Sequence, residues 1–145
     1  MPFNPIRVLN PALRSAATAP RFLASRSFHT SLPRMTIHNI ETLDGFKETI
    51  AKNPIVVLDA FATWCGPCKA IAPLVAKWSE SPEFKDTVYF AKFDVDHLPD
   101  LSQELGIRAM PTFIIFKDGE KVDEFVGANP GPLQSLVTKY ATAAA

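Results

Sequence analysis

Beyond its N-terminal segment, the chain switches repeatedly between the hydrophobic spacing of a strand and that of a helix. Nearly continuous apolar runs at 55–61, 88–95 and 112–117 predict strands, and the first suits a central strand that is covered on both faces. Apolar residues three and four apart predict helices between and after these strands. The expected helices are one at 42–52 capped by Thr42, one capped by Cys65 with an apolar stripe from Cys68 onward, a short one at 98–105, and a last one that opens at Pro130 or Pro132.

Two short segments complete the predicted sheet. Ile37 and Ile40 flank a segment that fits an edge strand. Asp118-Gly119 is a hairpin turn signal, so residues 121–126 are expected to pair back on the strand before them. The resulting order, β-α-β-α-β-α-β-β-α, predicts an α/β fold with a central mixed β-sheet flanked by helices on both faces.

Composition limits the classes of protein that this chain can form. Its 145 residues are 47% hydrophobic, which fits one soluble globular domain with a real core. No apolar stretch approaches the roughly 20 residues that a membrane span requires. All fifteen acidic residues and ten of the fifteen basic ones follow residue 34, which gives this part a net charge of −5. We therefore expect neither a membrane nor a nucleic acid as a partner.

The other five basic residues are arginines and lie within residues 1–34, which contain no acid. Segments rich in Arg, Ser and Ala and free of acid are typical of mitochondrial presequences. Three of these arginines recur every seven residues and would share one face of a helix. We therefore interpret residues 1–35 as a presequence for the mitochondrial matrix, cleaved or disordered, with cuts after Ser27 and Met35. The domain that follows is expected at 36–145.

Two other interpretations of this segment stay open. A disordered basic tail has the same composition, whereas a secretory signal is disfavoured because the segment lacks a continuous apolar core of about 7–15 residues. Met35 also allows a second start, which would give a cytosolic form of the same domain.

The only two cysteines, Cys65 and Cys68, lie between the predicted central strand and the helix that follows it. A bridge across so short a loop removes little entropy from the unfolded chain and therefore adds little stability, which argues against a purely structural role. A helix N-terminus carries partial positive charge and unpaired N–H groups, which stabilise a thiolate at Cys65 and lower its pKa. We predict Cys65 as the attacking nucleophile and Cys68, one turn into the helix and more buried, as the resolving thiol.

Two alternatives to redox chemistry at this pair fit the sequence less well. Structural zinc needs about four ligands, yet His29 lies in the predicted presequence, and neither His38 nor His97 has a partner at ligand spacing. A chance pair of cysteines in a structural loop is disfavoured by its place between a strand and a helix. We therefore expect no bound metal and no bound cofactor, only a redox-active disulfide.

Residues 57–69, which contain Trp-Cys-Gly-Pro-Cys, resemble the active-site segment of the thioredoxin family. Gly66-Pro67 is the dipeptide that this family carries between its cysteines, where it bears on the redox potential. The resemblance covers about residues 36–145 and implies the thioredoxin fold. It continues through three further segments, 91–96, 106–112 and 125–128.

The resemblance also implies roles for residues outside the cysteine motif. Asp59 matches the buried aspartate of the family, and desolvation in its apolar strand should raise its pKa, as suits a general base or acid for Cys68. Lys92 matches the lysine beside this aspartate and would modulate it. The alternatives are a structural carboxylate at Asp59 and an ordinary solvated lysine at Lys92.

Pro111 matches the proline that is cis in the family. It would present the backbone of Met110 to an extended substrate chain, which adds to the protein as a further strand. The resemblance implies a flat apolar surface whose weak specificity fits many protein targets. That substrate-binding surface comprises Trp64, Gly66, Pro67, Met110, Pro111, Gly127 and Ala128.

The resemblance predicts a monomeric protein-disulfide reductase that serves cell redox homeostasis. An NADPH-dependent thioredoxin reductase would supply its electrons, and its targets would include peroxiredoxins and methionine sulfoxide reductases. A stronger oxidant or isomerase on the same fold is a variant of this prediction. The alternative from another class is a redox-independent binding subunit that uses only the flat apolar surface and would survive replacement of both cysteines.

Overall fold

The structure is a computed structural model, and it describes residues 36–143. The predicted presequence at 1–35 lies outside the described residues. No helix among residues 36–143 is both long enough and apolar enough to cross a membrane. In chain order the elements are β1 (Ile37–Asn39), α1 (Leu43–Lys52), β2 (Ile55–Phe61), α2 (Gly66–Glu80), β3 (Tyr89–Asp94), α3 (Pro99–Glu104), β4 (Thr112–Lys117), β5 (Glu120–Val126) and α4 (Pro130–Thr142).

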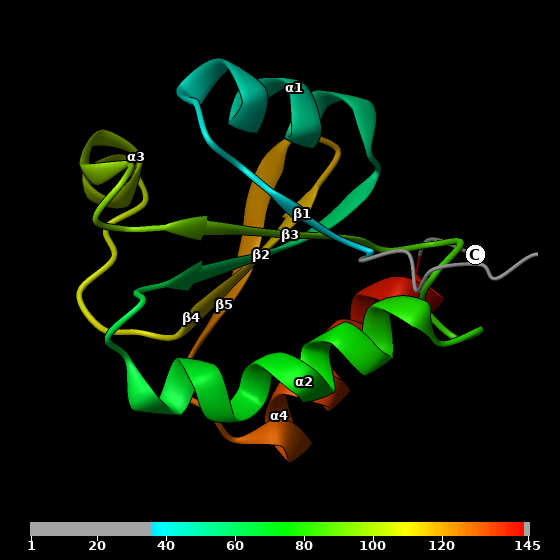
Figure 1. Cartoon of the computed structure of the whole chain (residues 1–145). Helices are drawn as coiled ribbons and strands as arrows, with labels where there is room; N and C mark the ends of the chain where they lie inside the picture. The colour runs from blue at the N-terminus through cyan, green and yellow to red at the C-terminus, as the bar shows by residue number, and fades with distance from the viewer. Residues whose placement is uncertain (1–35, 144–145) are drawn as a thin grey trace, which may run out of the picture. The chain divides into compact units, whose positions relative to one another are not determined.

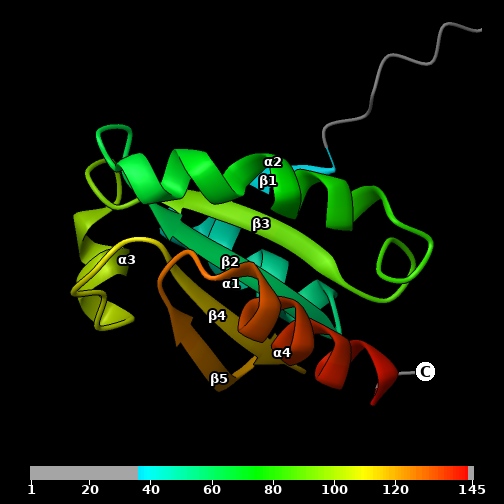
Figure 2. The same cartoon turned by 90° about the horizontal axis from the view of Figure 1, so that it is seen from below.

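A five-stranded mixed sheet forms the centre of the described domain, with the strand order β1-β3-β2-β4-β5. β3 pairs in parallel with both β1 and β2, whereas β4 runs antiparallel to β2 and to β5. α1 and α3 cover one face of the sheet, and α2 and α4 cover the other (Figure 1; Figure 2). The predicted mixed sheet with helices on both faces is confirmed.

β2 positions the site, because it lies in the middle of the sheet and ends just before the cysteine motif. Its residues 55–60 are all buried. Side chains alternate between the two faces of a strand, so Val57 packs with residues of α2 and α4, while Leu58 packs with residues of α1 and α3. Asp59 has the same parity as Val57 and therefore faces the side of the sheet that α2 covers.

β2 and β4 have the predicted bounds, and the other observed boundaries differ from the predicted ones by at most two residues. β3 is one residue shorter at each end than the predicted strand. α2 begins at Gly66, directly after Cys65 and two residues before the start of its apolar stripe at Cys68. The hairpin turn lies where the sequence predicts it. Asp118 and Gly119 there have φ angles of 51° and 86°, the positive values that a tight two-residue hairpin turn requires.

Candidate active site

The cysteine motif lies where β2 ends and α2 begins. Cys65 is the N-cap residue of α2, and Pro67 follows in the first turn, where the N–H that proline lacks has no partner within the helix. A disulfide joins Cys65 to Cys68, with the Cα atoms 5.3 Å apart. The backbone N–H of Cys68 donates to Sγ of Cys65 at 3.2 Å. The helix end thus directs a donor at this sulfur, as the sequence predicts.

The disulfide is buried in a small apolar cluster. Cys65 and Cys68 are 5% and 4% exposed and pack with Ala62, while Phe61 and Met110 pack against this group. Cys68 is thus only slightly less exposed than Cys65 in the disulfide state, because the bridge holds both sulfurs in the same cluster.

Three loops meet at the disulfide. The Met110–Pro111 peptide bond is cis, as the family resemblance implies. The carbonyl oxygen of Met110 lies 3.6 Å from Sγ of Cys65. The N–H of Gly127 donates to the carbonyl of Pro111 at 2.9 Å. These contacts bring the segments after β2, before β4 and after β5 together around one sulfur.

The residues predicted to bind substrates therefore surround the disulfide, but they differ in exposure. Trp64 is 67% exposed, and Gly66 and Pro67 are exposed beside it. Pro111 is buried, so it shapes the backbone there rather than offering an apolar face. The other members of the predicted surface, Met110, Gly127 and Ala128, are partly exposed.

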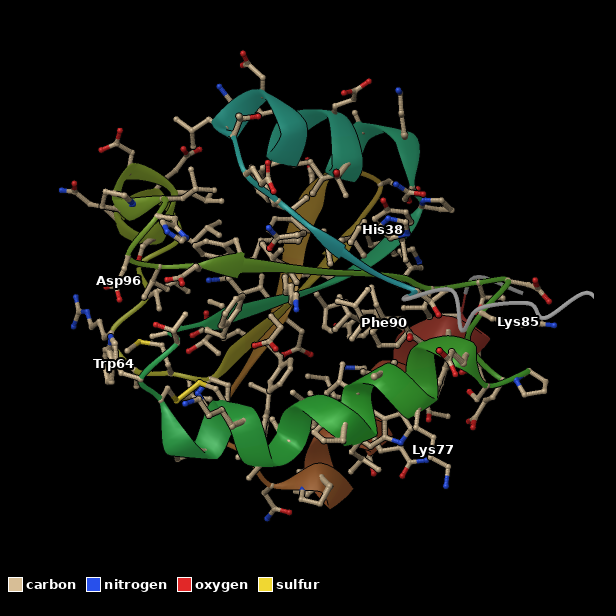
Figure 3. The ribbon with its side chains drawn as sticks, viewed as in Figure 1. His38, Trp64, Lys77, Lys85, Phe90 and Asp96 are labelled. Carbon is tan, nitrogen blue, oxygen red and sulfur yellow. A yellow bond between two sulfur atoms is a disulfide. The ribbon has the colours of Figure 1, made fainter. Side chains whose placement is uncertain are left out.

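One residue near the site has no role in the sequence-based prediction. Asp96 accepts a hydrogen bond from Nε1–H of Trp64 at 2.9 Å, and the two side chains lie at the same edge of the domain (Figure 3). The N–H of Asp96 in turn donates to the buried carboxylate of Asp94 at 2.9 Å. This hydrogen bond holds the exposed indole of Trp64 in one orientation. In the sequence, only the acidic residues of the segment 91–96 hint at such a hydrogen-bond acceptor.

Asp59 lies beneath the site with a carboxyl group that the fold leaves largely unsatisfied. The residue is 7% exposed, and its Oδ1 has no hydrogen-bond partner within residues 36–143. Burial raises the pKa of Asp59 from 3.8 to about 7, while the charge of Lys92 acts in the opposite direction. The raised pKa is the direction expected for a carboxylate in an apolar strand. At neutral pH this group can both accept and donate a proton.

Lys92 lies directly across from Asp59 in the parallel register of β2 and β3. Its Nζ lies 5.4 Å from the centre of the Phe61 ring. The structure thus brings Lys92 to the aspartate, as the family resemblance implies, and gives its ammonium an aromatic face as a second neighbour.

The zinc alternative depends on further ligands. Among the described residues no group of three or more His, Cys, Asp or Glu side chains is arranged to hold a metal ion. Instead, the two cysteines are bonded covalently to each other.

A redox-active disulfide at a helix N-terminus, beside a cis-proline and above a buried acid, defines a thiol–disulfide oxidoreductase. The class narrows to one family when the chain is compared with known proteins. The thioredoxin family model matches residues 37–139, and the chain belongs to this family.

Individual relatives agree with this assignment. Thioredoxin-2 of Pyricularia oryzae is 47% identical over 124 residues, which cover 86% of this chain and 71% of that protein. Mitochondrial thioredoxin-3 of Saccharomyces cerevisiae is 37% identical over 124 residues, which cover 86% of this chain and 91% of that protein.

Solved structures confirm the thioredoxin fold. Thioredoxin of Malassezia sympodialis (Mala s 13) is 46% identical, has a TM-score of 0.71, and is matched over 79% of this chain and 98% of its own. A second chain, 36% identical with a TM-score of 0.67, is matched over 72% of this chain and 95% of its own. It comes from a structure on thiol resolution in a yeast mitochondrial 1-Cys peroxiredoxin by the glutathione and thioredoxin systems.

Proposed function

We propose that this protein is a protein-disulfide reductase that works through the Cys65–Cys68 pair and serves cell redox homeostasis. The hydrogen bond from the N–H of Cys68 to the sulfur of Cys65 supports this proposal most directly. In the reduced protein, the same N–H and the positive end of α2 stabilise a thiolate at Cys65. The thiolate is the form of cysteine that attacks disulfides.

The proposed cycle has two exchange steps. Cys65 attacks a target disulfide, forms a mixed disulfide and releases the first target sulfur as a thiolate. Cys68 then attacks Sγ of Cys65, which forms the intramolecular bridge and releases the second target sulfur. The target gains two electrons, and the bridge must be reduced before the next turn. Gly66 and Pro67, which separate the two cysteines, tune the redox potential of the pair.

Asp59 is the proposed proton acceptor for the second step. Cys68 must lose its thiol proton before it attacks, and a carboxylate whose pKa is about 7 matches the pH at which the transfer takes place. In the reverse direction the same carboxyl acts as an acid. Lys92 modulates it, because a positive charge favours the ionised form.

Targets bind at what we call the docking surface, which comprises Trp64, Gly66, Pro67, Met110, Pro111, Gly127 and Ala128. The carbonyl oxygen of Met110 lies 3.6 Å from the attacking sulfur, which supports this assignment. An extended target segment can pair with that backbone as an added strand and so bring its own disulfide to Cys65.

Thioredoxin reductase, with NADPH as the source of electrons, is the proposed donor that reduces the bridge. Peroxiredoxins and methionine sulfoxide reductases are the proposed targets, with the protein acting as a monomer. The yeast structure described above supports the peroxiredoxin assignment by similarity.

The arginine-rich, acid-free composition of residues 1–35 supports a mitochondrial presequence ahead of a thioredoxin domain at 36–145. The similarity to a mitochondrial yeast thioredoxin points to the same compartment, the matrix. A form that starts at Met35 would remain in the cytosol. N-terminal sequencing of the native protein tests processing, and an intact Met1 on the mature form would refute it.

The activity is tested by supplying NADPH, thioredoxin reductase and a protein disulfide, with the full chain as the electron carrier. We expect NADPH consumption that depends on this chain and that disappears in Cys65→Ser. The absence of consumption with the unmodified chain would overturn the proposal.

A further inference from the structure

Two adjoining cavities lie on the side of β2 that α2 covers, and both reach Asp59. The first cavity also borders Cys68, so the proposed donor and acceptor of the proton share one space. The second continues along α2 past Pro73 to Glu80. Both are lined by Asp59, Lys69, Ala72 and Lys92, and we call them together the rear groove.

The rear groove and the docking surface have no residue in common. None of the seven docking-surface residues lines either cavity within the described part of the chain. During the second exchange step a target protein covers the docking surface, because it is still covalently bound to Cys65. A proton taken from Cys68 at that moment must therefore reach solvent by a route that avoids the docking surface.

Few groups near the carboxyl of Asp59 could accept its proton. Its Oδ1 is buried and has no hydrogen-bond partner among residues 36–143. Besides Cys68, which is the proton donor, the other titratable groups that line the rear groove are Lys69, Glu80 and Lys92. Lys69, which lines both cavities, and Glu80, at the far end of the second, are exposed, so both cavities are in contact with water. The groove is therefore a continuous space from the acid to solvent.

We propose that Asp59 exchanges its proton with solvent through the rear groove while a target covers the docking surface. This inference rests on the proposed role of Asp59 in the second step. In that step the Cys68 thiol gives its proton to the Asp59 carboxylate, the Cys65–Cys68 bond forms, and the target sulfur leaves with the electron pair of the broken mixed disulfide. The proton passes from Asp59 to water in the groove, and the departing target thiolate is protonated by bulk solvent.

Chemical rescue tests this route in the full chain. Asp59→Ala removes the acceptor and should slow the decay of a preformed mixed disulfide by about tenfold or more, since general bases contribute at least that much. Imidazole, whose pKa resembles the 6.5 of a histidine side chain, is then added as a small diffusible base. The first cavity, with a volume of about 270 Å³, has room for a molecule of this size. We expect imidazole to accelerate the decay of the mixed disulfide in Asp59→Ala by about fivefold or more.

A matched pair of substitutions then asks where the base enters. Ala72→Leu narrows the rear groove where its two cavities meet, whereas Ala51→Leu adds the same side chain at an exposed site in α1. In the Asp59→Ala background we expect Ala72→Leu to abolish the rescue and Ala51→Leu to leave it intact. The rate of alkylation of Cys65 shows that the site is still folded in each variant.

The outcomes separate the two proposals. If Asp59→Ala resolves the mixed disulfide at the normal rate, the role of Asp59 fails and the route fails with it. If Asp59→Ala is slow but imidazole gives no rescue, or rescues equally well with Leu at position 72, the route is wrong while the role of Asp59 stands.

Discussion

The docking surface and the rear groove flank the same disulfide but are built in different ways. The docking surface depends on backbone shape in three loops, including the cis bond before Pro111 and a φ of 111° at Gly127. The rear groove lies between regular elements and depends on burial, with a carboxyl whose pKa desolvation raises to about 7. In the proposed mechanism, backbone shape selects the targets that bind, whereas burial sets the pH range in which Asp59 exchanges its proton. Substitutions in the two regions should therefore change different measurements.

The largest effect is expected at Cys68, which borders the rear groove, whereas Cys65 contacts the docking surface. Cys68→Ser leaves the attack by Cys65 intact but removes the thiol that resolves the mixed disulfide. Turnover should fall by about a thousandfold or more, while a covalent adduct with the target accumulates. Mass spectrometry and non-reducing gels measure the adduct. Cys65→Ser is the control and should form none; release of target from Cys68→Ser at the normal rate would contradict the assignment.

Asp59 should make stability depend on pH. The pKa of this group is raised from 3.8 in the unfolded chain to about 7 in the folded one, so the folded state binds the proton more tightly. The cost of ionising the buried group is absent below pH 3.8, grows between the two values and is complete above about pH 7, where it reaches about 4 kcal/mol.

Asp59→Asn removes this titration. We expect its free energy of unfolding, relative to that of the unmodified protein, to rise by about 4 kcal/mol between pH 4 and pH 8. The net gain at pH 8 should be smaller than this, because the new amide also lacks partners. Denaturant titrations of the disulfide form at both pH values measure it. Asp86→Asn, at an exposed position, controls for loss of a formal charge. Parallel curves for Asp59→Asn and the unmodified protein would show that Asp59 is not buried as described.

Local sequence patterns are enough to predict the elements that position the site. β2 has the bounds that its apolar run predicts, because a buried central strand needs continuous hydrophobicity and Asn53-Pro54 ends the helix before it. The N-cap role of Cys65 follows equally from local features, since Pro67 in the first turn of α2 marks where the helix starts.

Contacts between distant segments could not be predicted in this way. The partner of Trp64 is Asp96, 32 residues away, and nothing in the periodicity links the two. The pairing of Lys92 with Asp59 depends on the register of two parallel strands, which hydrophobic patterns leave undetermined. Phe84 is fully buried although it lies in a loop, where a lone apolar residue has no period to reveal it. Family resemblance supplied Lys92, but not the other two.

A smaller effect is expected at Gly127 on the docking surface. A Cβ there meets nothing within 4 Å, so Gly127→Ala should cause no clash, only strain from the φ of 111°. We expect it to destabilise the protein by about 1–2 kcal/mol and to weaken the hydrogen bond to the carbonyl of Pro111. Gly131→Ala is the matched control, because this glycine lies in α4 with no positive φ, where alanine should stabilise by about 0.5–1 kcal/mol. Equal effects at both positions in denaturant titrations would argue against the described backbone.

The smallest effect, and the one that best separates shape from proton transfer, is expected for Trp64→Phe. This change keeps an exposed aromatic ring on the docking surface but removes the 2.9 Å hydrogen bond to Asp96. The loss of one such bond, worth about 1 kcal/mol, should raise the KM for a protein disulfide by about fivefold. The rate with a small aromatic disulfide and the pH dependence of the second exchange step should not change, because the rear groove is untouched. Asp96→Asn keeps an acceptor for the indole and should have the weaker effect. A shifted pH profile in Trp64→Phe would mean that the two regions are coupled through the disulfide after all.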